Sequence, residues 1–234
     1  MGTTEYQGVR ISMLGHASAL LEAGGKRVLI DPFKLNTVST EPADLSRGHG
    51  AGGWAGGHAD VVFVTHEHYD HCSIEDLQQA CGKDTIVVTV VGCQSKLMQN
   101  IDAKTFLVVA PGDSGKVADT GIGFEAVAAY NTNKQFHPRE NEWAGFVVTI
   151  NGVRVYHAGD TDLISEMGSV QCDVALLPVS GTYVMTAEEA ARAAGVVGCK
   201  LAIPMHYGGI VGTIADAQRF IALLPQGVAG RILE

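Results

Sequence analysis

The chain has 234 residues, of which 46% are hydrophobic and 18% charged, which is typical of a globular protein with a large core and excludes a disordered one. Its formal net charge of −9 argues against a sequence-independent grip on nucleic acid, which depends on Lys and Arg against phosphates. The first residues show no basic head followed by an apolar run, and the apolar runs of the chain are only long enough for strands, so we expect no signal peptide and no membrane span. The five cysteines form no CxxC pair, which predicts reduced thiols in a cytoplasmic protein.

Short apolar or alternating runs between turn residues predict strands along the whole chain. In chain order these runs cover residues 8–14, 18–23, 27–32, 60–65, 85–91, 105–110, 122–130, 144–150, 153–159, 173–180 and 200–206. Helical spacing of apolar residues predicts helices over 73–81, 93–101, 186–198 and 213–224. Two of these helices start with capping motifs, which pair Ser73 with Asp76 and Thr186 with Glu189. Because no repeat, linker or composition break is visible, we expect a single domain over residues 1–234, with helices covering mixed sheets.

A glycine-rich segment, residues 48–57, lies in the long loop before the strand at 60–65. It contains the pattern GxGxxG at Gly48, Gly50 and Gly53. A dinucleotide-binding fingerprint needs a strand before this pattern and a helix after it, and here a loop precedes it and a strand follows. We therefore expect no organic cofactor here, and the role of the segment is open between a mobile lid and a plain surface loop.

Histidine and aspartate side chains follow three of the predicted buried strands. They are His66, His68, Asp70 and His71 after the first of these strands, Asp160 after the second and His206 after the third. Loops converge at the carboxyl ends of strands in such sheets, so these side chains are expected to meet there. His66 and His68 project to the same side of an extended segment, and a turn at Tyr69-Asp70 brings Asp70 and His71 close. Solvated surface histidines are the alternative, but three of them rarely follow one strand, and the grouping predicts a site for two adjacent metal ions.

The segments THEHYDH (65–71), YHAGDTD (156–162) and PMHYGG (204–209) resemble, in this order, the signature of the metallo-β-lactamase superfamily. The segment 14–33 is similar to the branch that holds ascorbate-phosphate lactonase and the N-acyl-phosphatidylethanolamine phospholipases D. The resemblance covers nearly the whole chain. It implies an α+β fold, a four-layer αβ/βα sandwich in which two mixed β-sheets lie between helix layers, with a dinuclear site on one edge.

The resemblance also implies a set of ligands and catalytic residues. One metal is held by His66, His68 and a further histidine, the other by Asp70, His71 and His206, and Asp160 bridges the two. In the family the residue at Asp70 additionally holds the nucleophile by a hydrogen bond. Imidazole and carboxylate ligands suit Zn²⁺ and also Mn²⁺ and Fe²⁺, so we expect two divalent ions, with zinc as the first choice.

The further histidine is where this sequence departs from the family pattern. In the superfamily it stands just past the strand that here covers 122–130, a position occupied by Tyr130 or Asn131. The neutral amide of Asn131 is a poor partner for zinc beside two imidazoles. We therefore predict that His137, in a polar loop long enough to fold back, is the ligand, and that Asn131 is a pocket residue whose loss spares the metal. The alternative is a solvated His137, with water completing the coordination.

Four other residues have two readings each. Asp31 matches a family position that supports the metal loop, or it is a turn cap before a proline. His16 lines the pocket, or it is a strand-end histidine bonded to the backbone. Tyr207 donates to a substrate oxyanion, or it is packed. His157 orients a neighbour, or it lies satisfied in the core.

The leading functional hypothesis is a cytoplasmic metal-dependent hydrolase. Two metal ions about 3.5–4 Å apart can share a hydroxide that attacks a carbonyl or phosphoryl centre, so a small-molecule lactone, phosphoester or phosphodiester is the expected substrate. A di-iron oxidoreductase or dioxygenase on the same fold is the alternative, and a non-catalytic binding module is a third, against which the complete ligand set argues. The substrate, the native metal and assembly into a homo-oligomer stay open.

Overall fold

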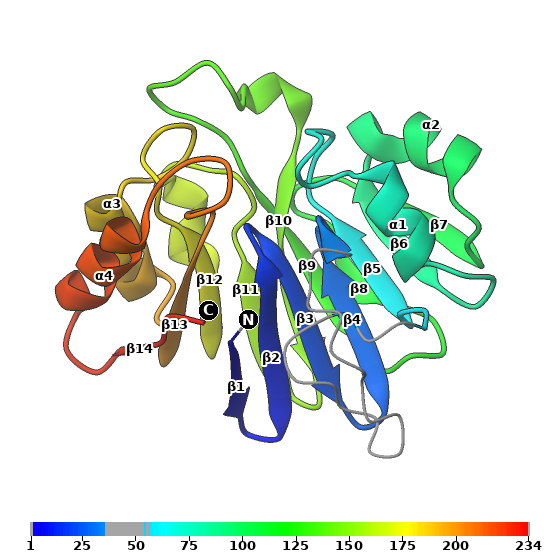
Figure 1. The fold of residues 1–234 in the computed structure, drawn as a ribbon, viewed down its shortest axis with the longest axis horizontal. Helices are drawn as coiled ribbons and strands as arrows, with labels where there is room; N and C mark the ends of the chain where they lie inside the picture. The colour runs from blue at the N-terminus through cyan, green and yellow to red at the C-terminus, as the bar shows by residue number, and fades with distance from the viewer. Residues whose placement is uncertain (1, 36–53, 55–56, 234) are drawn as a thin grey trace.

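The computed structural model describes residues 2–35, 54 and 57–233, and two seven-stranded sheets form its centre (Figure 1). The first sheet, in spatial order, contains β1 (Thr3–Tyr6), β2 (Val9–Gly15), β3 (Ser18–Ala23), β4 (Lys26–Ile30), β5 (Val61–Val64), β6 (Ile86–Val90) and β7 (Thr105–Val109). The second, in the order β14 to β8, contains β8 (Ser114–Lys116), β9 (Gly123–Ala128), β10 (Ala144–Ile150), β11 (Val153–His157), β12 (Val174–Pro178), β13 (Leu201–Met205) and β14 (Ala229–Gly230). Each sheet therefore comes from one half of the chain.

Both sheets are mixed, as expected. Strands β1 to β4 are antiparallel neighbours and β4 to β7 parallel ones, while β8 to β11 are antiparallel and β11 to β14 parallel. Parallel strands are covered on both faces, which explains why β5, β6, β12 and β13 are continuous apolar runs without an exposed residue.

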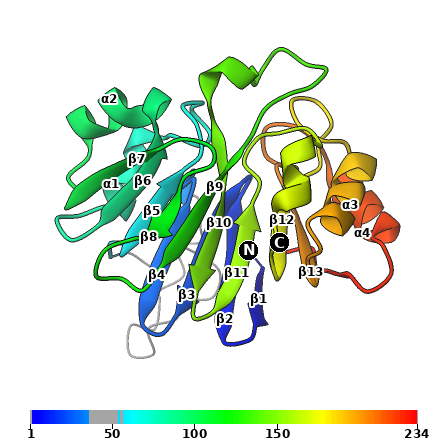
Figure 2. The same cartoon turned by 180° about the vertical axis from the view of Figure 1, so that it is seen from behind.

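The helices cover the outer faces of the two sheets (Figures 1 and 2). The helices α1 (Ile74–Ala80) and α2 (Val91–Asn100) lie on the side of the first sheet, and α3 (Ala187–Val196) and α4 (Ile214–Leu223) lie against β12 and β13 of the second. The predicted four-layer sandwich is confirmed. Within the described residues, no helix has the length and apolar character needed to cross a bilayer.

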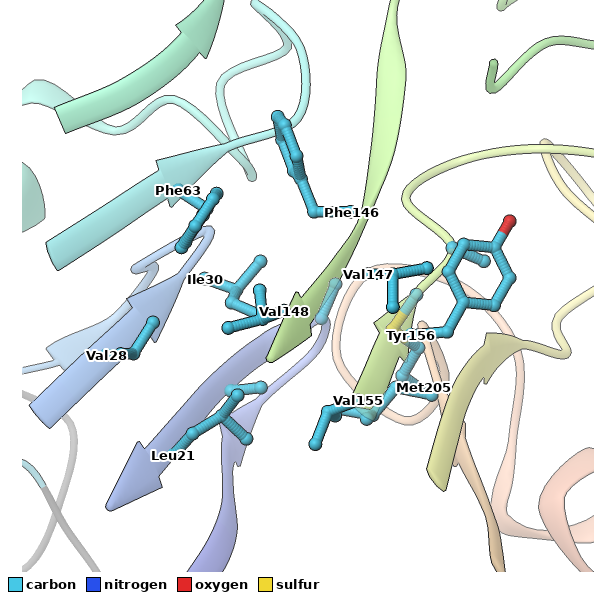
Figure 3. Packing of buried hydrophobic residues seen from close by; sticks show 14 of the residues in the cluster. Leu21, Val28, Ile30, Phe63, Phe146, Val147, Val148, Val155, Tyr156 and Met205 are labelled. Atoms are coloured by element: carbon cyan, nitrogen blue, oxygen red, sulfur yellow. The ribbon is translucent and has the colours of Figure 1, made fainter. Parts of the chain in front are cut away.

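The inner faces of the two sheets pack against each other to form the core (Figure 3). Phe63 of β5 contacts Phe146 of β10 with ring centroids 5.0 Å apart, beside Ile30 of β4 and Val148 of β10. Fully burying such a side chain contributes about 1.5–3 kcal/mol to stability. This packing fixes the two sheets relative to each other, and with them the loops that leave their upper edge.

Two details differ from the sequence-based expectation. Strand β1 was not predicted. Its residues show no alternation of apolar and polar side chains, and the strand lies half-exposed at the edge of its sheet. The Ser73 side chain caps α1 as expected, but the carboxylate of Asp76 accepts from the backbone N–H groups of Lys34 and Leu35 (3.0 and 2.8 Å). Asp76 therefore fastens the segment after β4 to α1. The box of Thr186 and Glu189 is confirmed at α3.

Most of the glycine-rich segment 48–57 lies outside the described residues, including Gly48, Gly50 and Gly53. Of its residues, Trp54 and Gly57 are described, and the guanidinium of Arg27 lies over the Trp54 ring at 4.1 Å from its centroid. The two expectations for this segment therefore stay predictions.

Candidate metal centre

The loops that follow β5, β9, β11 and β13 bring the predicted site residues together at one edge of the sandwich, the upper edge in Figure 1. The loop after β5 starts with His66, the loop after β9 carries His137, and Asp160 and His206 follow β11 and β13. Three groups of candidate ligand atoms result, in each of which the atoms lie within 4.8 Å of one another. These groups are His66, His68 and His137; His16, Asp70, His71 and His206; and His66, His71 and Asp160.

Asp160 lies between the group of His66, His68 and His137 and the group of His16, Asp70, His71 and His206, and contacts both. Its Oδ1 is 3.2 Å from Nε2 of His71, and its Oδ2 is 3.0 Å from Nε2 of His206 and 3.3 Å from Nε2 of His137. The side chain is 3% exposed. A single buried carboxylate thus contacts histidines of both groups, which is the position that a bridging ligand needs.

Four of the histidines share one arrangement, in which the ring Nδ1 contacts a side chain behind it and Nε2 faces the centre. The pairs are His66 with Thr65 (2.9 Å), His71 with Asp31 (2.7 Å), His137 with Asn131 (3.1 Å) and His206 with Ser180 (3.1 Å). Hydrogen bonds of this kind fix the tautomer and orientation of histidines that bind metals.

The chemistry of the partners assigns three of the tautomers. Asp31 is a carboxylate and can only accept, so Nδ1 of His71 carries the proton. The hydroxyl of Thr65 donates to Asp31, so it accepts from Nδ1 of His66. The Asn131 amide donates to the carbonyl of Tyr183 at 2.9 Å and presents its oxygen to His137. Each of these rings, when neutral, turns an Nε2 lone pair toward the centre.

Several buried atoms of the centre lack a hydrogen-bond partner among the described residues. They are Nε2 of His71, His137 and His206, and Oδ1 of Asp160. Buried polar atoms without a partner are rare in native proteins and require an explanation. Three imidazole nitrogens and a carboxylate oxygen around one space are the donor set that Zn²⁺, Mn²⁺ or Fe²⁺ takes, so the residues present fit divalent metal ions.

The charges within the centre support the same interpretation. Burial disfavours the charged form of Asp160, but His206 and His71 outweigh it and hold the pKa of this carboxyl well below its usual range. Burial likewise disfavours a charged His71, but Asp160 and Asp31 raise the pKa of its imidazole well above the ordinary value. Burial, with His71 next, lowers the pKa of His66 well below that value. These pKa directions favour an ionised carboxyl at Asp160 and a second proton, on Nε2, at His71, and binding of a cation would displace this second proton.

Three residues of the site adopt a left-handed backbone conformation although they are not glycines. The φ angles are 47° at His16, 48° at Asp31 and 61° at His206. This conformation costs of order 1–3 kcal/mol for such residues and is concentrated at functional sites. Each of the three lies directly after a strand, where the left-handed turn directs the chain away from the sheet and into the centre.

Several residues that support the site were not predicted from the sequence. The indole of Trp143 is 4% exposed and contacts the rings of the first group, with centroids 4.9 Å from His66, 4.8 Å from His68 and 5.5 Å from His137. Lys134 forms an ion pair with the buried Asp162, which holds the loop of His137 against the segment after β11. The residue letters alone carry no signal for these contacts, since they arise between loops.

The structure shows the surroundings of the other residues that have two readings. Asp31 is buried and accepts from His71 and Thr65, an arrangement that agrees with a supporting role behind the loop of His71. His16 donates from Nε2 to Asp70 at 3.1 Å and also lines a cavity, and Tyr207 lies half-buried on the wall of the same cavity. His157 is bonded to the carbonyl of Ala17 at 2.8 Å and is a satisfied core residue.

His137 is 1% exposed, so the alternative of a solvated loop histidine is wrong. Asn131 binds His137 twice, because its amide oxygen also accepts from the His137 backbone N–H at 3.0 Å. We expect His137→Ala to weaken metal binding at one site by about 100-fold. Asn131→Ala should weaken it by about 10-fold, as loss of an orienting hydrogen bond does, which revises the expectation that metal content is spared. Metal titration with a chromophoric chelator measures both, and a larger loss in Asn131→Ala than in His137→Ala would contradict the assignment.

The chain is similar in sequence and fold to known proteins. A family model described as the beta-lactamase superfamily domain matches residues 10–206. A protein of Geobacillus thermodenitrificans (strain NG80-2), named UPF0173 metal-dependent hydrolase, is 32% identical over 97% of both chains. One of the same name from Methanoregula boonei is 34% identical over 91% of this chain and 88% of the relative. A crystallised candidate metal-dependent hydrolase of Parabacteroides distasonis ATCC 8503 is 29% identical, with a TM-score of 0.78 over 100% of this chain and 98% of that one.

Proposed function

The chain belongs to the beta-lactamase superfamily and to its metal-dependent hydrolases, and from this premise we propose that it hydrolyses a small-molecule lactone, phosphoester or phosphodiester with two divalent ions, most simply zinc. His66, His68 and His137 would hold one ion, and Asp70, His71 and His206 would hold the other, with Asp160 shared. The observation that carries the proposal is the set of buried Nε2 atoms that face Asp160 without a hydrogen-bond partner among the described residues.

When bound, the ions would supply a water of lowered pKa and a Lewis acid for the oxygen that gains charge. The remaining work belongs to the chain. The Oδ2 of Asp70 accepts from the Nε2–H of His16, which fixes the orientation of the carboxylate. Besides binding the ion, this carboxylate would hold the attacking water by a hydrogen bond. The half-buried Tyr207, which follows His206 and lines the cavity beside the centre, would donate from its hydroxyl to an oxygen of the substrate.

The first test is the metal content. Two groups of ligands around a shared carboxylate should bind two ions per chain. We expect elemental analysis after incubation with zinc and removal of free ions to give two zinc ions per chain, and chelation to abolish hydrolysis until zinc is restored. A ceiling of one ion per chain would exclude the dinuclear site.

The substrate class is tested by a screen of lactones, phosphodiesters and phosphomonoesters with zinc-loaded protein, with chelated protein as the matched control. Chelator-sensitive turnover of at least one class is expected. The di-iron oxidoreductase is not favoured, since the relatives are named hydrolases. Two iron ions in protein purified without added metal, together with failure of every ester in the screen, would overturn the hydrolase proposal.

A further inference from the structure

A cavity of about 390 Å³ opens directly beside the metal centre, between the end of β2 and the loop after β13. His16 forms part of its wall and also contacts Asp70 of the centre, so one side chain separates the cavity from the ligand cluster. We call this space the His16 cavity. Its volume lies in the range of small-molecule sites.

The walls of the His16 cavity are mainly apolar. The apolar lining residues are Met13, Leu14, Phe33, Pro204 and Leu233. Phe33 also packs edge-on against His16 and Tyr69, with ring centroids 6.2 and 5.8 Å apart, so the apolar wall continues to the loop of the metal ligands. Among the described lining residues there is no carboxylate, and the polar side chains are those of His16, Lys34 and Tyr207. An apolar group that covers the five apolar residues removes their surface from water, which favours binding.

His16 supplies a polar contact at the inner end of the cavity. Its side chain is 3% exposed, and its Nε2–H donates to the carboxylate of Asp70, which can only accept. Its Nδ1 is buried and has no hydrogen-bond partner among the described residues. A Cβ at Gly209, which lines the cavity, would stand 3.5 Å from this Nδ1, so Gly209 lies directly against the His16 ring and no larger side chain fills the space beside it.

We propose that the His16 cavity binds an apolar arm of the substrate, with the ring of His16 separating this arm from the metal centre. The substrate is then an amphiphilic ester or phosphoester, whose polar centre reaches the metal ions while its hydrocarbon arm fills the cavity. This inference rests on the proposed function, since it takes the neighbouring centre as the place of the reaction.

A competing apolar surface lies elsewhere on the rim of the centre. Phe136, next to His137, is 49% exposed and packs edge-on against Tyr183 with ring centroids 4.6 Å apart. These two rings form an open surface and do not line the His16 cavity. A cavity excludes water from more of a bound chain than an open pair of rings does, so the arm is assigned to the cavity.

The probes are straight-chain hydroxamic acids from acetohydroxamic to octanohydroxamic acid, since the hydroxamate binds metal ions and the chain varies alone. Isothermal titration calorimetry with zinc-loaded protein measures their affinities. Each buried methylene should strengthen binding by about fourfold until the cavity is full. Affinity that does not change with chain length would overturn the proposal.

Gly209→Val tests the location of the chain. No positive φ is required at Gly209 and its Cβ contact with His16 is an ordinary van der Waals one, so the change should narrow the cavity without strain in the backbone. We expect the ratio of octanohydroxamic to acetohydroxamic affinity to fall by about 10-fold. Gly168→Val is the matched control, because Gly168 is also exposed, has no atoms within 4 Å of its Cβ position and is remote from the cavity. An unchanged ratio in Gly209→Val would place the chain elsewhere.

A second readout does not depend on any variant. In protein labelled with ¹³C at the methionine methyl groups, the Met13 signal should shift with octanohydroxamic acid and not with acetohydroxamic acid, whereas the exposed Met98 should not respond. A silent Met13 beside chain-dependent affinity would favour the rings of Phe136 and Tyr183 and overturn the proposal. If acetohydroxamic acid does not bind, the proposed metal centre is wrong. The response of the Met13 signal to octanohydroxamic acid then tests binding in the His16 cavity independently of the metal centre.

Discussion

Asp160→Ala should abolish hydrolysis, with a loss of more than about a hundredfold, and should strip metal ions from both groups of ligands. The reason is that Asp160 contacts His71, His137 and His206 at once, so no other described side chain links the two groups in this way. The nucleophile depends on the ions, so the rate falls with them. Turnover under saturating zinc and metal content after gel filtration measure the two losses together.

The control for this change is Asp160→Asn, which keeps the shape of the side chain and removes its charge. It should still lose most activity, because a neutral amide oxygen is a poor bridge between two cations. Far-ultraviolet circular dichroism should be unchanged in both variants, since Asp160 lies in the loop after β11 and its truncation opens no cavity in the apolar core. Near-normal turnover in a variant without metal would refute the role of Asp160.

Asp31→Ala should be the most destabilising single change at the site, at about 3–5 kcal/mol in the free energy of unfolding. Asp31 is fully buried and accepts three hydrogen bonds, from the backbone N–H and the hydroxyl of Thr65 and from Nδ1 of His71. Each buried donor that loses its acceptor costs about 1–3 kcal/mol. The left-handed φ of 48° adds to the cost, because Ala adopts it less readily than Asp.

Urea unfolding of the metal-free protein measures this effect without a contribution from bound ions. Asp31→Asn should cost less, because its amide oxygen still accepts from Thr65. Asp102→Ala is the matched control at an exposed aspartate and should change stability by less than about 0.5 kcal/mol. If Asp31→Ala unfolds like Asp102→Ala, Asp31 does not support the loop of His71.

The strands with continuous apolar runs could be predicted from the sequence, because burial on both faces of a sheet requires apolar residues at every position. The edge at which the ligands meet could be predicted too, because the ligands directly follow these strands. The polar edge strand β1 was missed, because its pairing with β2 depends on tertiary context. The same limit applies to the site. His66, His68 and His71 follow one strand and form a recognisable motif. His137 lies in a loop, and the conformation of this loop cannot be predicted from the residue types.

The residues behind the histidines were the least predictable part of the site. Asn131 and His137 are only six residues apart, yet the hydrogen bond between their side chains depends on how loop 131–143 folds back. Trp143 directly precedes β10, where an apolar residue is expected for packing alone, and the residue type does not indicate that three imidazoles are its neighbours. Such contacts are set by side-chain geometry across loops, for which hydrophobic periodicity has no signal.

Because each half of the chain forms one sheet, the two halves have to be held together by contacts between the sheets and by whatever binds across them. The turn between β7 and β8 is the covalent link between the halves, and the loop of His66 comes from the first half while Asp160 and His206 come from the second. An ion held at the seam would therefore be chelated by both halves at once, and neither half alone would carry a complete coordination sphere. The free energy of ion binding would then stabilise the packing of the two halves against each other, so that the same ions would serve both the stability of the tertiary structure and the reaction.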